Sequence, residues 1–351
     1  MKPLPFHRGA AALCLVVLGV TACGNNDGDT GSGSGDEAGN EDSMVLYSGR
    51  NEELIQPLVD EFSQQSGIEV EVRYGDTAEL AAQLIEEGEN TPADVFLAQD
   101  AGALGAVSAQ DLFDELPADL LDQVPEIYRD QDGDWMGVSG RLRTLIYNTD
   151  LVDESELPET VEELTEPEYE GRLGVAPTNG SFQSFVTAYR VTEGEDAAQS
   201  WLNDLEDNNP QYREGNGPIV SDVIDGNLDM GLVNHYYLYG QAAERGLDME
   251  ELPAENHLFG DGDVGALLNV AGAGIFDADS ESSVELVEHL LSEEGQNYFV
   301  DETAEYAMIE GLEPPPGMPS LEELDVPDID LNQLEDLETT VRMITDSGMV
   351  G

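Results

Sequence analysis

The chain has 351 residues, enough for a large hydrophobic core and for more than one lobe. It carries 76 acidic residues against 12 lysines and arginines, so its formal net charge is −64 at pH 7. Nucleic acid is excluded as a partner, because phosphate binding requires clustered Lys and Arg. The acidity either collects cations or forms a solvated, halophile-like surface suited to high salt. The acids are spread over the whole chain, which favours the second explanation.

Residues 1–22 are predicted to form a lipoprotein signal peptide. A basic start is followed by an apolar run at 10–20, shorter than the ~20 residues that a membrane-spanning helix needs. The segment Val-Thr-Ala-Cys at 20–23 resembles the lipobox of bacterial lipoproteins. This resemblance implies cleavage before Cys23 and acylation of its thiol. The alternative is a plain signal peptide with a chance cysteine.

Residues 23–43 are predicted to be a flexible, acidic, lipid-anchored linker. They include no large apolar residue, so they cannot bury enough surface to offset the entropy lost on ordering. The only other cysteine, Cys14, lies in the signal, so the exported domain is expected to lack disulfides. Cleavage would also remove Lys2 and Arg8, which leaves ten arginines, no lysine and a formal charge of −66.

Strands and helices alternate in the first part of the exported domain. Hydrophobic periodicity and capping signals predict these elements, in order: a strand at 45–47, a helix at 51–65, a strand at 69–74, a helix capped by Asp76, and a strand at 94–98. This alternation is typical of a parallel sheet covered by helices.

The second part shows the same class of architecture, without an internal sequence repeat. The predicted elements are a strand at 173–176, helices at 182–191, 196–205 and 219–224, a strand at 230–233, a helix at 236–245, a returning strand at 267–276, helices at 283–291 and 295–302, a surface segment at 313–332 and a helix at 337–347. Ligands of α/β sheets bind outside the carboxyl ends of strands, so the loops at 48–51, 98–100, 177–181 and 234–237 are expected to converge.

One segment suggests the chemistry of the site. The strand at 230–233 ends in Asn234 and His235 and is followed by two adjacent tyrosines, Tyr236 and Tyr237. This segment resembles the Asn-Asn-Tyr-Tyr-like segment of bacterial periplasmic ferric-ion-binding proteins, the solute receptors of ABC transporters. Six further motifs occur in that family's order: Tyr-Ser-Gly-Arg at 47–50, Pro-Ala-Asp-Val-Phe at 92–96, Ser-Gly-Arg at 139–141, Pro-Thr-Asn-Gly at 177–180, Asp-Val-Gly-Ala-Leu at 263–267 and Glu-Gly-Gln at 294–296.

The resemblance implies an α/β, two-lobed periplasmic-binding-protein fold (type II-like) with a central ligand cleft and a hinge. The approximate boundaries place 44–141 and 266–316 in lobe 1, and 142–265 and 317–351 in lobe 2. Two lobes that close by hinge motion would each supply part of the ligand's surroundings.

The resemblance also implies that Tyr236 and Tyr237 bind Fe³⁺. This small, hard cation prefers anionic oxygen donors and can displace the proton of a phenol whose ordinary pKa is about 10. Adjacent residues of a regular strand point to opposite faces. The two phenols can therefore share one ion only where the strand breaks, before the helix that starts at Tyr236. The alternative is that the tyrosines simply pack at the end of a sheet. If the tyrosines bind iron, the adjacent His235 is expected to support the site without contacting the ion.

In the family, phosphate or carbonate completes the iron site. Asn179, Gly180 and Ser181 match the anion-binding loop, and Asn216 and Asn234 match two further anion contacts. The loop precedes a helix, whose free N–H groups and dipole favour an anion. An ordinary capped turn is the alternative.

Two positions depart from the family pattern. Asn51 stands where many members have a His ligand, and Gln99 stands where some have a Glu ligand. Glu52, Asp100 or water could substitute for them. The contribution of lobe 1 to a metal site therefore stays open, and these departures weaken the prediction of iron more than the prediction of a receptor.

The sequence thus predicts a non-enzymatic solute-binding lipoprotein, monomeric and anchored outside the cell membrane by Cys23. It would deliver ferric iron and a synergistic anion to a permease driven by an ATPase. One alternative is a receptor of the same fold for a polyamine, thiamine or an oxyanion. Another is an extracellular hydrolase, against which the sequence shows no nucleophile–His constellation.

Overall fold

The computed structural model describes residues 43–260 and 262–350. The predicted signal peptide at 1–22, Cys23 and nearly all of the predicted linker lie outside these residues. Within the described part of the chain, no helix is both long enough and apolar enough to cross a bilayer.

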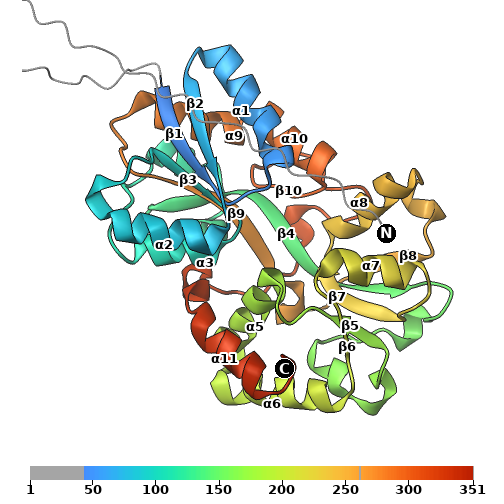
Figure 1. Ribbon diagram of the computed structural model, residues 1–351. Coiled ribbons are helices and arrows are strands. Elements are labelled where there is room, and N and C mark those ends of the chain that lie inside the picture. Colours follow the sequence, from blue (N-terminus) through green and yellow to red (C-terminus); the bar gives the residue numbers. More distant parts are fainter. Residues whose placement is uncertain (1–42, 261, 351) are drawn as a thin grey trace, which may run out of the picture. The chain divides into compact units, whose positions relative to one another are not determined.

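The strands form one mixed sheet in the order β2-β1-β3-β9-β4-β7-β5-β6, with β8 and β10 also paired to β4 (Figure 1). Their bounds are β1 Ser43–Ser48, β2 Glu69–Tyr74, β3 Val95–Ala98, β4 Trp135–Asn148, β5 Leu173–Val175, β6 Gln211–Tyr212, β7 Met230–Asn234, β8 Ala254–His257, β9 Leu268–Ile275 and β10 Tyr306–Ala307. Strands β1, β2 and β3 pair in parallel, as predicted, and β9 returns antiparallel to β3 and β4.

The helices are α1 Glu52–Ser66, α2 Thr77–Glu87, α3 Ala101–Ser108, α4 Ala118–Leu121, α5 Gly180–Glu193, α6 Glu195–Asp207, α7 Asn216–Ile224, α8 Tyr236–Arg245, α9 Glu281–Leu291, α10 Glu293–Thr303 and α11 Leu337–Asp346. Helices α1, α9 and α10 group on one side of strands β1–β3, and α2 and α3 group on the other (Figure 1). The mixed α/β fold class is confirmed.

Capping residues explain where several helices begin and end. The side chain of Asn51 accepts the Glu53 N–H at the start of α1, and Gly67 ends α1 with a φ of 82°. Only glycine adopts this left-handed conformation without a steric penalty. Asp76 caps α2 by accepting two backbone N–H groups. Both predicted helix starts are therefore confirmed.

Strand β4 connects the two parts of the sheet. Its first half pairs with β9 through Leu142, and its second half pairs with β7 and β8 from Arg143 onward. All 14 of its residues are buried. Hydrophobic periodicity did not predict this strand, which carries two arginines in its buried middle.

The C-terminal segment crosses between the two parts of the sheet. A short 3-10 helix, Leu331–Glu335, packs closely on α3, where a Cβ on Gly102 would lie 2.6 Å from the backbone oxygen of Leu334. Helix α11 follows and packs on α5 and α6 (Figure 1). Asp336 at its start pairs with Arg190 of α5 at 2.9 Å. The segment therefore fastens α3 to α5.

Candidate functional site

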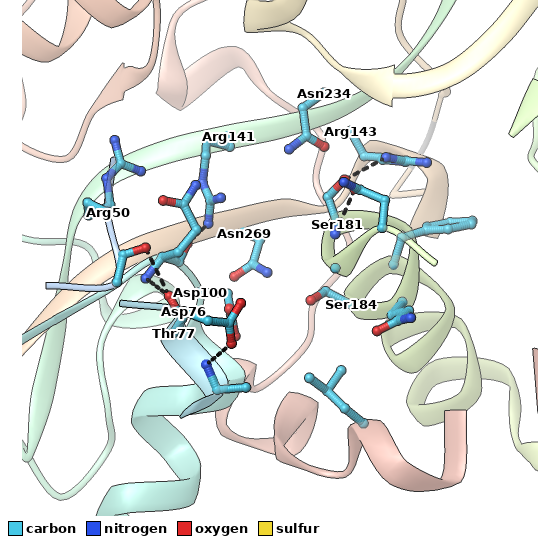
Figure 2. Close-up of a pocket in the computed structure, with 18 of the residues that line it drawn as sticks. Arg50, Asp76, Thr77, Asp100, Arg141, Arg143, Ser181, Ser184, Asn234 and Asn269 are labelled. Atoms are coloured by element: carbon cyan, nitrogen blue, oxygen red, sulfur yellow. Dashed lines mark hydrogen bonds between the residues drawn. The ribbon is translucent and has the colours of Figure 1, made fainter. Parts of the chain in front are cut away.

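A cavity of about 600 Å³ lies where the carboxyl ends of several strands meet (Figure 2). The predicted convergence is confirmed, because residues from each of the four loops at 48–51, 98–100, 177–181 and 234–237 line it. Arg141 and Arg143 of β4, Asn269 of β9 and Leu337 of α11 complete much of the wall.

Helix starts surround this cavity. Thr77 of α2, Gly180 of α5, Tyr236 of α8 and Leu337 of α11 are first residues of their helices, and all line it. The caps of α1 and α3, Asn51 and Asp100, line it as well. The N-terminal end of a helix carries partial positive charge and free N–H groups. The cavity is therefore electrostatically suited to an anion, although the chain is strongly acidic.

The two adjacent tyrosines lie at a break between strand and helix, as predicted. Strand β7 ends at Asn234 and helix α8 begins at Tyr236. The Tyr236 and Tyr237 rings stack with centroids 4.5 Å apart and planes inclined by 27°. Burial and the neighbouring Tyr237 raise the pKa of Tyr236; Arg141 acts in the opposite direction, and Glu305 adds a weaker rise. Its phenol is consequently protonated at neutral pH unless a cation displaces the proton.

The predicted anion loop forms a connected polar group. Asn179 caps α5, and its Oδ1 accepts from the Ser181 N–H at 3.1 Å and from the Ser181 hydroxyl at 2.6 Å. Ser181 Oγ accepts in turn from Asn216 Nδ2 at 2.9 Å. Gly180 and Asn234 line the same cavity. The five residues predicted from the family pattern are thus close together, although Asn216 lies behind the wall rather than in it.

Arg141 and Arg143 were missed as site residues. They are two positions apart on β4, so they share one face of the strand. They are only 5% and 2% exposed, and within the described residues no carboxylate oxygen lies within 4.0 Å of either. Seven of the other arginines do have such a partner. Buried charges are normally paired, so an arginine without a carboxylate beside a cavity indicates an anionic ligand.

The contacts of Arg143 place it at the anion loop. Its Nη1 donates to Ser181 Oγ at 3.3 Å and its Nη2 donates to the Leu232 carbonyl at 3.0 Å. The guanidinium also lies over the Phe185 ring, 5.4 Å from its centroid. Burial lowers the pKa of Arg143 to about 9, with Tyr237 acting in the opposite direction. At neutral pH the group remains charged.

Arg50 also lines the cavity, but its charge is already compensated. Its Nη2 donates to both carboxylate oxygens of Glu305, at 2.9 and 3.0 Å, and Ser139 Oγ donates to the same carboxylate. Burial alone would raise the pKa of Glu305, but the nearby Arg50 and Arg141 charges outweigh it, so the pKa is lowered. This pair joins the end of β1 to the segment before β10.

The β1–β3 side of the cavity offers few anionic ligands. Asn51 and Gln99 line it with neutral side-chain amides, and the backbone carbonyl of Gln99 accepts a hydrogen bond from Arg141 Nη2. Asp100 is engaged as the cap of α3, and burial raises its pKa against the opposing charge of Arg141. Glu52 is exposed and is not among the residues that line the cavity. Within the described residues, no three His, Cys, Asp or Glu side chains are grouped to hold a metal.

The buried ring of His235 links strand β4 to the residue that follows helix α10 through two hydrogen bonds. Its ring is fully buried, Nδ1 accepts from the Leu142 N–H at 3.1 Å, and Nε2 lies 2.7 Å from the Ala304 carbonyl. These partners assign the proton to Nε2. Burial lowers the pKa of His235 to about 4. The ring therefore ties β4, β7 and the end of α10 together directly behind Tyr236.

Comparison with known proteins places the chain in a family. The family model described as bacterial extracellular solute-binding protein matches residues 90–335. The chain belongs to this family. The matched range of this extracellular solute-binding protein contains Arg141, Arg143, the anion loop and both tyrosines.

Individual relatives agree with the family match along most of the chain. The Fe(3+)-binding periplasmic protein of Serratia marcescens is 31% identical, over 88% of this chain and 90% of the relative. The major ferric iron-binding protein of Neisseria meningitidis is 29% identical, over 87% and 93%. Among solved structures, iron-bound HitA from Pseudomonas aeruginosa aligns with a TM-score of 0.79 and 31% identity, over 87% of this chain and 99% of that one.

Proposed function

We propose that this solute-binding protein captures ferric iron together with an anion. One observation carries the proposal: the stacked rings of Tyr236 and Tyr237 line the same cavity as the start of helix α5, where Arg143 donates to Ser181. Two relatives named for ferric iron binding and an iron-bound structure, each similar over most of the chain, support it.

In this proposal, Tyr236 and Tyr237 bind the ion through their phenolate oxygens. Fe³⁺ supplies the charge that removes their protons, and the position at the start of α8 lets both reach one ion. Because burial raises the pKa of Tyr236, protons compete effectively for this ligand. Iron should be released as the pH falls, since metal binding requires the deprotonated ligands.

The anion would bind at the start of α5, between Arg143 and the loop residues Asn179, Gly180 and Ser181. Arg143 supplies the charge, the helix start supplies N–H groups, and Asn216 holds Ser181 in place. Phosphate and carbonate both fit this donor set, because each offers several oxygens to N–H and O–H donors.

The alternatives differ in how well they suit the charges of the wall. A polyamine or thiamine receptor would place cations beside two buried arginines that lack carboxylate partners, which is unfavourable. An oxyanion receptor without iron is the second candidate, favoured by those arginines and by the neutral amides of Asn51 and Gln99. A hydrolase has no support in the residues that line the cavity.

Closure over the ligand would move the parts of the sheet on either side of β4. We propose lobe 1 at 44–141 and 266–316 and lobe 2 at 142–265 and 317–351. The change of strand partners in β4, from β9 to β7 after Leu142, supports the first boundary. The part of the C-terminal segment on α3 would then cross back to lobe 1.

We further propose that the protein is a monomeric receptor held at the outer face of the cell membrane by acylated Cys23, and that it delivers its ligand to a permease and its ATPase. Family membership as an extracellular solute-binding protein supports this placement. Cys23→Ser is expected to prevent lipid labelling and to release the protein from the membrane fraction. A variant that stayed acylated and membrane-bound would contradict the assignment.

The iron proposal is tested with Tyr236→Phe and Tyr237→Phe. Each removes one oxygen and should lower ferric iron affinity at least ~100-fold, about 2.7 kcal/mol, and weaken the visible phenolate-to-iron charge-transfer band. Tyr239→Phe is the matched control on the same helix, because Tyr239 donates to the Pro316 carbonyl and does not line the cavity. Unchanged affinity in both tyrosine variants would show that iron binds surface carboxylates instead.

A further inference from the structure

We infer that the protein has a second ligand site, for a small organic cation with an apolar body and a hydroxyl or carbonyl group at the end opposite its charge. The site is a cavity of about 660 Å³ between the segment at 125–128, strand β10 and the segment at 308–326. Among the described residues, none lines both this cavity and the central one. The His235 ring adjoins both, with centroids 6.0 Å from the Tyr236 ring and 5.2 Å from the Tyr306 ring.

The wall of this second cavity is predominantly apolar. Its side chains include Ile127, Met308, Ile309, Leu312, Leu321 and Leu324. Ile127 is 43% exposed, so part of this apolar surface is left uncovered by the rest of the described chain. A concave apolar surface enclosing this volume lies within the range typical of small-molecule sites, and covering it with an apolar body is favourable.

One polar group in the wall lacks a partner. Tyr306 is 1% exposed, and its hydroxyl has no hydrogen-bond partner within the described residues. Burial raises the pKa of this phenol, so the hydroxyl keeps its proton and can donate. The phenol of Tyr239, which adds to the rise, donates to the Pro316 carbonyl instead. A buried donor without a partner is unfavourable, which indicates a ligand with an acceptor oxygen at its buried end.

The charged residues of the wall are all acidic. Glu310, Glu313 and Glu322 line the cavity and are exposed, and no basic residue of the described chain lines it. An ammonium group therefore meets counter-charges that stay in contact with water, so little desolvation is required. An anion would be repelled here, whereas Arg141 and Arg143 make the central cavity favour one. The second site should therefore accept organic cations that the central cavity disfavours.

The role of the hydroxyl is tested on the iron-free protein with three matched aromatic probes. Tyramine has an ammonium and a hydroxyl group, phenethylamine lacks the hydroxyl, and 4-ethylphenol lacks the ammonium. Titration calorimetry should give tyramine a Kd below ~1 mM. Tyr306→Phe should weaken tyramine and 4-ethylphenol about 5-fold and leave phenethylamine unchanged. The fold should not lose stability, because the hydroxyl removed has no partner. Tyr298→Phe is the matched control, since its hydroxyl donates to the Leu54 carbonyl away from the cavity.

The acidic rim is tested by combining Glu310→Gln with Glu313→Gln. This double variant should weaken tyramine and phenethylamine about 3-fold and leave 4-ethylphenol unchanged, because only the first two probes carry a charge. Glu285→Gln combined with Glu288→Gln removes the same charge at exposed positions of α9 and should change the affinity of none of the probes.

Three results would overturn the inference. The first is no binding of tyramine at millimolar concentration. The second is tyramine binding that Tyr306→Phe leaves unchanged, which would place the probe on the acidic surface instead. The third is equal affinity for all three probes, since the site would then recognise neither the hydroxyl nor the charge.

Discussion

Replacing His235 by Asn should flatten the dependence of stability on pH in mildly acidic solution. The folded protein holds this ring neutral, with a pKa of about 4, because it is fully buried between Leu142 and Ala304. In the unfolded chain the same group titrates near its ordinary pKa of 6.5. Between these values the unfolded state binds more protons, so the free energy of unfolding falls as the pH is lowered.

The size of the effect follows from the two pKa values. Each unit of difference corresponds to about 1.36 kcal/mol, so His235 should remove roughly 3 kcal/mol of stability between pH 6.5 and pH 4. Many carboxylates titrate in the same range, and therefore only the difference between the parent and the variant isolates the histidine. The variant starts less stable, because Asn cannot reach both backbone partners.

The assay is urea unfolding at half-unit intervals from pH 4.5 to pH 7.5 in high salt, with His257→Asn as the control for loss of a histidine. The parent and His235→Asn should converge in stability as the pH falls, because only the parent loses the His235 contribution. Parallel pH profiles for these two proteins would refute the claim that the ring is held neutral by burial.

Two further predictions concern the charges of the fold. Glu305→Gln should destabilise the protein by about 3–5 kcal/mol, because it leaves Arg50 buried without a counter-charge. The melting temperature should therefore fall by roughly 10 °C. Glu302→Gln, at an exposed position, is the control, and an unchanged melting temperature of Glu305→Gln would contradict the prediction. The fold should also be markedly less stable at low ionic strength. Screening of the repulsion between its acidic groups weakens as the Debye length grows from ~8 Å at 0.15 M salt to ~30 Å at 0.01 M. A melting temperature that stays constant from dilute buffer to molar NaCl would contradict the high-salt interpretation.

The sequence predicted the strands and helices whose burial is one-sided or whose ends are marked. Helix α1 shows an apolar face with Asn51 and Gly67 at its ends, and β2 alternates along its length. The loop positions that line the cavity followed from the same elements, because parallel strands bring their carboxyl ends to one edge of the sheet.

Two of the missed elements, β4 and α3, are buried on nearly all sides. Strand β4 is enclosed by neighbours along its entire length, so it shows no alternation, and Arg141 and Arg143 make it resemble an exposed segment. Helix α3 is almost wholly buried between the sheet and the C-terminal segment, and its two glycines weaken the helical pattern. Such environments are created by distant residues. The only local signal was the presence of two of the chain's few arginines in one short segment.

The helix starts that surround the cavity have a consequence for the rate of capture. At a distance, the many acidic residues of the body repel an anionic solute, and only at short range do the cavity's arginines and helix N-termini attract it. Raising the salt to 1 M shortens the Debye length to ~3 Å, which suppresses the distant repulsion more than the contacts within the buried cavity. The association rate constant for an anionic solute should therefore rise with salt concentration, the reverse of ordinary electrostatic steering. The receptor would then capture its ligand fastest in molar salt.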